Sequence, residues 1–492
     1  MYYLGLDIGT SGCKAGVFDI NGECIHVAHR SYSVMQPVYG AMELDVAHVW
    51  NSCLSCLEEC GQKFGDKIAA ISVASQGEAI FPVTASGDAL AHAMTTFDTR
   101  STRQAAYLQE QLAALPAEVL LRPADNMYSA SKILWQKENG SRNDDFEKQL
   151  WKYMCFSDYA VWMLCGVAAI DYSMASRTLL FDVKNKCWHP DALKICGIDK
   201  ELLSDPVPSG TALAAIRPAL AQKLGLSADT MIVSGGHDQQ CCAFGVGAVA
   251  DGVVMDTLGT TESLLAVSPA CAYDARLLQT GIPCDAFLFT GSYAYLGFLS
   301  TSGQVTDWYK RTLLKDQLTF AQLSETGSAP TGLLAIPHFA GSGTPVLDAK
   351  NRGLIYGLTA ATDTQTMFKG LLEGTAYEVR LNIDKLREYD FQINQIRVTG
   401  GGASSDLWVQ VKADITGIPQ TVMKAKESGC LGAAMLAAKG AGHIAAGEYP
   451  WVKIDHVTDP DPENQKRYEI LYQQYKLLHQ KIGEIRHELY LP

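Results

Sequence analysis

Two short stretches, Asp7-Ile-Gly-Thr-Ser-Gly-Cys-Lys14 and Thr257-Leu-Gly-Thr-Thr-Glu262, decide the fold predicted for this chain of 492 residues. Each follows a run of apolar residues and places a glycine directly before two hydroxyl residues. An apolar run resumes after each stretch, so both predict a strand–turn–strand unit. Their separation of about 250 residues predicts a duplicated architecture, with one unit opening each half of the chain. A chance similarity between two short strings is the alternative.

Both turns have the chemistry of a phosphate-binding loop. Glycine lets the backbone approach an anion closely, while backbone N–H groups, hydroxyls and a lysine supply donors. The candidate phosphate contacts are Thr10, Ser11 and Lys14 in the first turn and Gly259 and Thr260 in the second. Asp7, at the mouth of the first turn, is a candidate for holding Mg²⁺ through water, because this ion binds few carboxylates and keeps several waters. An ordinary tight hairpin is the alternative for each turn alone, whereas the pair favours a clamp that holds phosphate groups from two sides.

Length and charge limit the class of protein. A chain of 492 residues exceeds the size of one hydrophobic core, so we expect two domains, 1–245 and 246–492. With 40 basic and 53 acidic residues the formal net charge is −13, which argues against nucleic acid or an anionic membrane as a partner. The sequence shows no signal-peptide pattern and no apolar run that predicts a transmembrane helix. Its 14 cysteines are scattered, which predicts reduced thiols in a cytoplasm.

A third stretch, residues 233–245, contains the candidate catalytic residue. Asp238 follows a predicted strand and two glycines at the expected domain junction, where it is suitably placed to meet a substrate hydroxyl. A carboxylate can accept the proton of that hydroxyl as a phosphoryl group is transferred. There are two alternatives: Asp238 only caps the helix that follows, or His237 is the base.

A fourth stretch, residues 396–414, predicts a strand, a turn of three glycines and a helix. Ser404 or Ser405 can cap that helix, and Gly417 ends it. A glycine turn at a helix N-terminus can lie flat beneath a nucleotide.

Two further features are interpreted as structural. Cys53, Cys56 and Cys60 recur at helical spacing without a second ligand cluster, so they are interpreted as buried residues rather than metal ligands. The acidic stretch Asp455–Glu463, with two prolines, predicts a linker to a C-terminal helix over roughly residues 464–489.

Taken in order, these motifs resemble the FGGY family of carbohydrate kinases, in the actin-like ATPase superfamily, over about residues 1–445. The motifs that carry the resemblance are Asp7–Lys14, Met127–Asn139, Gly235–Gln239, Gly259–Thr260, Gly353–Leu358, Leu371–Gly374, Gly400–Gly402 and Glu427–Ala434. Gln136, Thr366 and Gly370 depart from the family pattern. The ordered set is specific, although no single motif decides it.

The resemblance implies an α/β fold of two ribonuclease-H-like domains that flank an interdomain cleft, in which ATP and the sugar meet. It implies that Asp238 is the general base, that Asp7 helps to place Mg²⁺, and that both turns contact the phosphates. The residues expected near the adenosine are Gly401, Gly402 and Asp406. The expected reaction is ATP-dependent phosphorylation of a hydroxyl of a small carbohydrate, with a ketopentose such as xylulose favoured over a hexulose, a sugar acid or a polyol. A homodimer is the base-rate expectation.

By the same resemblance, the loop after the predicted strand 68–74 contributes to the sugar site. The residues assigned to sugar contacts are Gln76, Gly77, Glu78, Asp98, Asp238 and Gln239. Carboxylate and amide groups can hydrogen-bond neighbouring hydroxyls, whereas a surface turn is the alternative for the loop 75–79. Glycerol kinases carry Arg and Trp where Gly77 and Thr96 stand, and xylulokinase-like members carry Met-His where Gly77-Glu78 stand, so the chain matches neither subgroup fully. The small Gly77 and Thr96 predict a pocket larger than one for glycerol.

Two hypotheses from other classes remain on the same fold. One is an actin-like ATPase that acts as a chaperone or filament, which gives no role to Glu78 or Asp238. The other is a catalytically silent sugar-binding regulator, which is disfavoured because every phosphate-loop and base position is retained.

Overall fold

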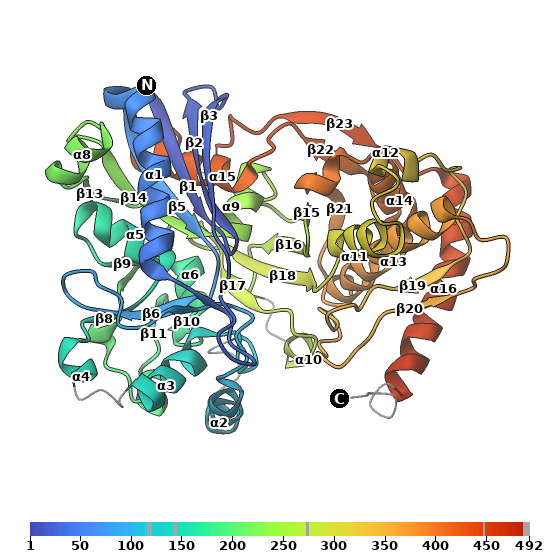
Figure 1. Cartoon of the computed structure of the whole chain (residues 1–492), viewed down its shortest axis with the longest axis horizontal. Helices are drawn as coiled ribbons and strands as arrows, with labels where there is room; N and C mark the ends of the chain where they lie inside the picture. Colours follow the sequence, from blue (N-terminus) through green and yellow to red (C-terminus); the bar gives the residue numbers. More distant parts are fainter. Residues whose placement is uncertain (114, 116–120, 141–144, 272–274, 446–447, 486–492) are drawn as a thin grey trace.

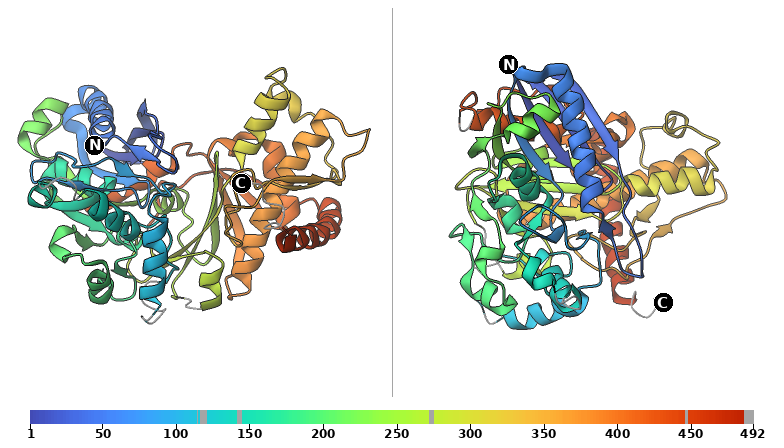
Figure 2. Two further views of the ribbon diagram at one scale, coloured as in Figure 1. Left: turned by 60° about the horizontal axis from the view of Figure 1, so that its bottom comes forward. Right: turned by 60° about the vertical axis from the view of Figure 1, so that its left-hand side comes forward.

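The chain forms two lobes, each built around one mixed β-sheet (Figures 1 and 2). The structure is a computed structural model, and it describes residues 1–113, 115, 121–140, 145–271, 275–445 and 448–485. The first half of the sequence builds one lobe and most of the second half builds the other.

The sheet of the N-terminal lobe has six strands in the order β13-β14-β5-β1-β2-β3. These strands are β1 (Tyr2–Ile8), β2 (Gly12–Asp19), β3 (Cys24–Ser31), β5 (Ile68–Ser75), β13 (Ala212–Ala215) and β14 (Met231–His237). β1, β2 and β3 are antiparallel neighbours, while β5 and β14 run parallel to β1. Helix α1 (Val46–Phe64) buries Cys53, Cys56 and Cys60 in the core beneath this sheet, which confirms their interpretation as buried residues.

The sheet of the C-terminal lobe has seven strands in the order β17-β18-β16-β15-β21-β22-β23. These strands are β15 (Gly252–Leu258), β16 (Glu262–Ser268), β17 (Cys284–Ala286), β18 (Tyr293–Leu299), β21 (Ile393–Thr399), β22 (Gln420–Met423) and β23 (Ile454–Thr458). The run β18-β16-β15-β21-β22 repeats the order and the directions of β3-β2-β1-β5-β14. The duplicated architecture predicted from the two turns is therefore confirmed.

Shorter strands and the helices complete each lobe. In the first half of the chain they are β4 (Glu43–Leu44), β6 (Ile80–Val83), β7 (Ala93–Met94), β8 (Lys152–Cys155), β9 (Ala169–Asp171), β10 (Phe181–Asp182), β11 (Cys187–Trp188), β12 (Asp205–Val207), α2 (Thr102–Leu112), α3 (Ser129–Gly140), α4 (Phe146–Gln149), α5 (Phe156–Cys165), α6 (Tyr172–Ser176), α7 (Pro190–Cys196), α8 (Pro218–Leu224) and α9 (Asp238–Gly245). In the second half they are β19 (Leu334–Ile336), β20 (Leu354–Tyr356), α10 (Ala275–Gln279), α11 (Gly303–Trp308), α12 (Phe320–Leu323), α13 (Thr364–Arg387), α14 (Asp406–Thr416), α15 (Ser428–Gly440) and α16 (Pro462–Ile485).

Helix α15 joins the two halves of the chain. It comes from the second half, but it packs against β1, β5 and α9 of the first (Figure 1). The contact is so close that a side chain at Gly5 would collide with the carbonyl oxygen of Cys430. The domain boundary predicted at residue 245 therefore stays a prediction, because α15, which follows that residue in the sequence, covers the N-terminal sheet.

The prediction of a linker over Asp455–Glu463 is wrong in its first part. Residues Ile454–Thr458 form β23, which pairs antiparallel with β22 at the edge of the sheet. Charged and polar residues suit such an edge, because they discourage pairing with another chain. Helix α16 begins at Pro462, close to the predicted start, and the residues predicted beyond Ile485 lie outside the described part of the chain.

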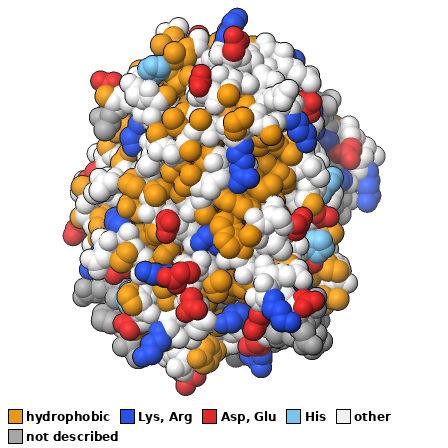
Figure 3. Space-filling view, turned by 90° about the vertical axis from the view of Figure 1, so that its left-hand side faces the viewer, with side chains coloured by type: hydrophobic (Ala, Val, Ile, Leu, Met, Phe, Trp, Pro, Cys, Tyr) orange, Lys and Arg blue, Asp and Glu red, His pale blue; other side chains and the backbone are white. Residues whose placement is uncertain are grey.

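Two observations concern the predicted partners of the chain: the character of its helices and the charge on its surface. Among the described residues, none of the helices combines the length and the apolar character that a membrane span needs. On the face of the N-terminal lobe shown in Figure 3, acidic and basic side chains lie interspersed.

Candidate active site

The first predicted phosphate loop is a tight turn between β1 and β2. The N–H of Gly9 donates to the carbonyl oxygen of Gly12 at 2.9 Å, which closes the turn. Gln76, which follows β5, braces it: its Oε1 accepts from the hydroxyl of Thr10 at 3.0 Å and its Nε2 donates to the carbonyl of Gly9 at 3.1 Å. The side-chain amide of Gln76 is therefore engaged by the phosphate loop, whereas the sequence assigned it to the sugar. Ser11 is exposed at the tip.

Asp7 and Lys14 lie where this loop meets the N-terminus of α15. The ammonium group of Lys14 pairs with Glu427 at 2.6 Å. The carboxylate of Asp7 lies so close to Gly429 that a side chain there would touch it at 2.6 Å. Burial raises the pKa of Asp7 to about 6, against the opposing effect of Lys14. A buried carboxylate with a raised pKa is typical of a functional site.

The second phosphate turn and the glycine turn share one cavity, although they lie far apart in the sequence. The cavity has a volume of about 440 Å³, within the usual range for a small-molecule site. Its lining includes Gly259 and Thr260 of the second turn, Gly401 and Gly402, and the ring of Trp408. Four sequence-predicted residues are thus brought together.

Helix α14 has the boundaries that the sequence predicts. The hydroxyl of Ser405 accepts from the N–H of Trp408 at the start of the helix, and Gly417 ends it in the left-handed conformation, with φ +68°. Asp406 is the first residue of the helix and is exposed. Ser404, Ser405 and Trp408 line the cavity, whereas Asp406 is absent from the lining, so its contact with adenosine stays a prediction.

A buried lysine beneath the second turn was missed by the sequence argument. Lys412 of α14 is fully buried, and its ammonium group contacts Asp256 at 2.9 Å and also pairs with Glu262. These two carboxylates flank the turn Gly259–Thr260, and Glu262 also accepts from the hydroxyl of Ser302. Burial and Asp256 raise the pKa of Glu262, against the attraction of Lys412. The triad fixes the second phosphate turn to the helix that carries Trp408.

Asp238 is the first residue of α9, directly after β14. The parallel pairing of β14 with β5 shifts register between Val233 and Gly236, an irregularity of the kind that re-aims side chains. A side chain at Gly235 would overlap the carbonyl of Val73, so glycine permits this close approach. The Asp238 side chain keeps 22% of its surface exposed. Burial, with Asp7 as the next cause, raises its pKa to about 8.

The two alternatives for Asp238 fit this geometry less well. A capping carboxylate accepts from an N–H two or three residues on, whereas Oδ1 of Asp238 accepts from the adjacent N–H of Gln239 at 2.6 Å. His237 is buried beneath Gly77, and burial, aided by Arg177, lowers its pKa to about 4. Its Nε2 lies 3.4 Å from Oδ1 of Asp238, so the neutral imidazole packs beside the carboxylate.

The loop after β5 belongs to a buried network of charges. Glu78 pairs with Arg177, and its Oε2 accepts from the hydroxyl of Thr96 at 2.9 Å. Arg177 also contacts Asp285 of the second half of the chain at 3.3 Å. Burial alone would raise the pKa of Glu78, but Arg177 and its other cationic neighbours hold it below the ordinary value. No local pattern in the sequence predicts the roles of Arg177 and Asp285.

The prediction that Gly77 enlarges the pocket because it lacks a side chain is wrong. A side chain at this position would meet the ring of His237 at 2.8 Å. The imidazole of His237 therefore fills the space that a side chain at position 77 would take, and no open space is left there. A pocket larger than one for glycerol cannot be derived from Gly77.

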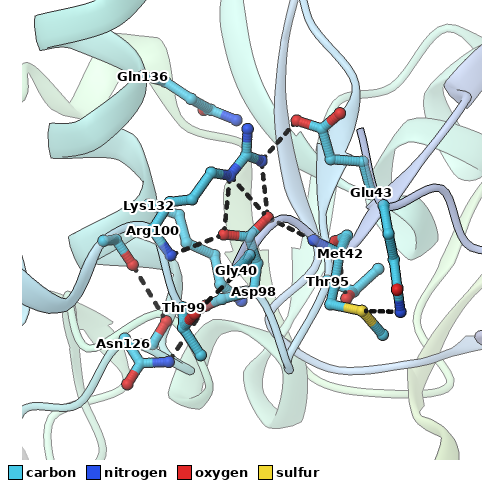
Figure 4. A network of polar contacts seen from close by, with 12 residues as sticks. Gly40, Met42, Glu43, Thr95, Asp98, Thr99, Arg100, Asn126, Lys132 and Gln136 are labelled. Atoms are coloured by element: carbon cyan, nitrogen blue, oxygen red, sulfur yellow. Dashed lines mark hydrogen bonds and ion pairs between the residues drawn. The ribbon is translucent and has the colours of Figure 1, made fainter. Parts of the chain in front are cut away.

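Asp98 lies in a separate polar network (Figure 4). Both of its oxygens accept from Arg100, and Oδ2 also accepts from the N–H of Met42 at 2.9 Å. Arg100 pairs in turn with Glu43 at 2.5 Å. The carboxylate is fully buried and joins these loop segments, so its predicted contact with a sugar stays a prediction.

These features define a class of protein. Each lobe carries a turn of glycine and hydroxyl residues, a cavity of suitable size lies beside the second turn, and a partly exposed aspartate follows β14. This combination is that of a two-lobed, ATP-dependent phosphotransferase.

Comparison with known proteins gives the family. The N-terminal domain of the FGGY family of carbohydrate kinases matches residues 2–245, and the C-terminal domain of that family matches residues 254–441. The chain therefore belongs to the FGGY family and is an ATP-dependent carbohydrate kinase, as its motifs predicted. This replaces the hypotheses of an ATPase that acts as a chaperone or filament and of a silent regulator.

Relatives and solved structures agree along the whole chain. A xylulose kinase of Staphylococcus epidermidis is 27% identical over 505 residues, which cover 99% of this chain and 98% of that protein. A gluconate kinase from Lactobacillus acidophilus has a TM-score of 0.91 and 24% identity, with 99% of both chains covered. A ligand-bound xylulose kinase from the same species has a TM-score of 0.90 and 24% identity, also with 99% of both chains covered. The predicted fold is confirmed.

Proposed function

We propose that this kinase transfers the γ-phosphoryl group of ATP to a hydroxyl of a ketopentose such as xylulose, with Asp238 as the general base. One observation carries the assignment of the site. Nδ1 of His237 and Oε1 of Gln239, on either side of Asp238, are buried and make no hydrogen bond within the described residues. Buried polar atoms are normally paired, so these two beside a candidate base fit a ligand that carries several hydroxyls.

The carboxylates also fit a magnesium ion. The charge of Asp7 raises the pKa of Asp238, and a divalent cation would relieve this repulsion between the two carboxylates. Asp7 would hold Mg²⁺, in part through water, and the ion when bound would neutralise charge on the β- and γ-phosphates.

In the proposed reaction the sugar hydroxyl donates its hydrogen bond to Asp238. The oxygen forms its bond to the γ-phosphorus, the bond from that phosphorus to the β-phosphate oxygen breaks, and ADP leaves. The hydroxyl proton passes to Asp238. Gly259 and Thr260 of the second turn would hold the phosphates from the side opposite to Thr10, Ser11 and Lys14, with the adenosine over Gly401 and Gly402.

The charge network favours a neutral sugar over a sugar acid. A free cation would favour a substrate carboxylate, whereas Arg177, which lies against Gly77, is already paired with Glu78 and Asp285. A hexulose or a polyol remains the alternative on the same fold. The full-length similarity to a xylulose kinase supports the ketopentose.

We expect Lys14→Ala and Thr260→Val each to raise the KM for ATP by about 10- to 100-fold, because a hydrogen bond to a charged group is worth about 1.5–3 kcal/mol. ADP formation at varied ATP measures this, and Lys424→Ala, an exposed lysine outside both turns, is the matched control. Unchanged kinetics in both variants would contradict the clamp of two turns.

We expect Glu78→Ala to raise the KM for the sugar by about 10-fold or more, because it removes a charged acceptor for sugar hydroxyls and a hydrogen bond to a charged group is worth about 1.5–3 kcal/mol. The KM for ATP should change less. Glu373→Gln is the control, since Glu373 is a buried glutamate bonded to Thr331 and Tyr468 in the C-terminal lobe. Equal effects on both KM values would remove Glu78 from the sugar site.

A further inference from the structure

A second cluster of possible ligands lies outside the nucleotide cavity, where α16 packs on the C-terminal lobe. His338 comes from the segment after β19, Glu378 from the middle of α13 and His479 from α16. One ligand atom from each lies within 4.8 Å of the other two. None of the three lines the cavity beside Gly259, and the proposed phosphoryl transfer uses none of them.

The spacing of these atoms suits a metal ion. Nε2 of His338 lies 3.2 Å from Oε1 of Glu378, and Nε2 of His479 lies 3.6 Å from the same oxygen. In a tetrahedral site with bonds of about 2.0–2.1 Å, neighbouring ligand atoms are about 3.3–3.4 Å apart. Both distances between a histidine nitrogen and Oε1 of Glu378 therefore match those between ligand atoms in a tetrahedral site to within a few tenths of an ångström.

Burial adds a second, independent observation. The side chains of His338, Glu378 and His479 are 6%, 4% and 14% exposed, and Nε2 of His338 is buried beside Glu378 without a hydrogen bond of ordinary geometry to any described residue. A buried imidazole nitrogen beside a carboxylate without a well-aligned hydrogen bond is costly unless a proton or a metal ion lies between them. The hydroxyl of Tyr475 donates to Glu378, a contact that orients a ligating carboxylate.

We propose that His338, Glu378 and His479 bind a Zn²⁺ ion. Two imidazoles and one carboxylate suit zinc, whereas magnesium and calcium prefer oxygen ligands alone. The fourth position would be taken by water beside His479, the most exposed of the three. The ion would fasten α16 to α13 and to the segment after β19, which already share a core that includes the rings of Tyr377, Tyr468, Tyr472 and Tyr475.

The competing account is a metal-free cluster in which a protonated histidine pairs with Glu378. The two accounts differ in their response to zinc. A cluster that relies on a proton gains nothing from the metal, whereas a ligand set gains stability in proportion to the metal bound.

The test is zinc binding by the full chain after removal of metal with a chelator, measured by competition with a chromophoric chelator. We expect one Zn²⁺ per chain to be lost in His479→Gln and in Glu378→Gln, with affinity lower by about 100-fold or more. His456→Gln is the matched control, because His456 is an exposed histidine paired with Asp455. The 14 cysteines can also bind zinc, so the difference between wild type and variant is the measured quantity.

A thermal measurement on the wild type keeps the test independent of whether a variant folds. Zinc should raise the Tm of the wild type and of His456→Gln, but not that of His479→Gln. Equal zinc affinity in all variants, or a wild-type Tm that zinc does not raise, overturns the proposal. Neither result bears on the kinase site, because none of these residues belongs to it.

Discussion

Asp238→Asn should lower kcat by about 10²–10⁴-fold, the usual contribution of a positioned general base, while the affinity for ATP stays nearly unchanged. Asparagine keeps the shape and can still accept a hydrogen bond from the sugar, but it cannot take the proton. Steady-state ADP release measures the loss. Asp191→Asn, an exposed aspartate in the first turn of α7, is the control for a change that affects only a helix terminus.

The pH dependence of the same site separates a base from a structural residue. The pKa of Asp238 is raised from its ordinary value of 3.8 to about 8, so the folded state gains protons relative to the unfolded state between these values. Its contribution to stability is therefore lost as the pH rises through this range. Asp238→Asn should then be at least as stable as the wild type at pH 8, and the wild-type kcat/KM for the sugar should rise as the carboxyl ionises. A folded Asp238→Asn protein with near-wild-type kcat would move the base elsewhere.

Lys412→Met should have the largest effect on stability. It removes the cation between Asp256 and Glu262, both fully buried, and leaves an uncompensated charge in the core. Breaking a buried ion pair by removing one partner typically costs about 3–5 kcal/mol. We expect the free energy of unfolding in urea to fall by that amount and the KM for ATP to rise, because the second phosphate turn loses its anchor.

A double variant tests whether the lost stability can be recovered. Adding Glu262→Gln to Lys412→Met removes one of the two stranded carboxylates and should recover part of the stability. Lys424→Met, at an exposed position, is the control and should change stability little. A loss of less than about 1 kcal/mol in Lys412→Met would mean that the carboxylates are protonated and need no partner.

The features that the sequence predicts correctly depend on local chemistry. The two turns need glycine beside hydroxyl residues, and α14 needs Ser405 at its start and Gly417 at its end, so short strings suffice to find them. The duplication follows because the same turn occurs at the same place in each half. The sequence also places Asp238 at the end of a strand, since a glycine pair precedes it.

The features that cannot be predicted from the sequence depend on contacts between distant segments. Gln76 follows a strand in the expected loop, but its partner is the turn at Gly9 and Thr10. Gly77 is small because the ring of His237 fills its place, which no local pattern reveals. For Lys412 a signal did exist: it lies four residues after Trp408, on the buried face of α14, where an unpaired lysine would be costly.

We propose that this carbohydrate kinase acts on a ketopentose, a substrate larger than glycerol. ADP release with ATP and magnesium, measured over a panel of ketopentoses, hexuloses, sugar acids, tetritols and glycerol, tests it most directly. We expect the highest kcat/KM with a ketopentose such as xylulose, in line with the full-length similarity to a xylulose kinase. Glycerol should be a poor substrate, because a site built to hydrogen-bond hydroxyls strongly rejects substrates that lack them. Glycerol or a sugar acid as the best substrate, or ADP release that no sugar stimulates, would contradict it.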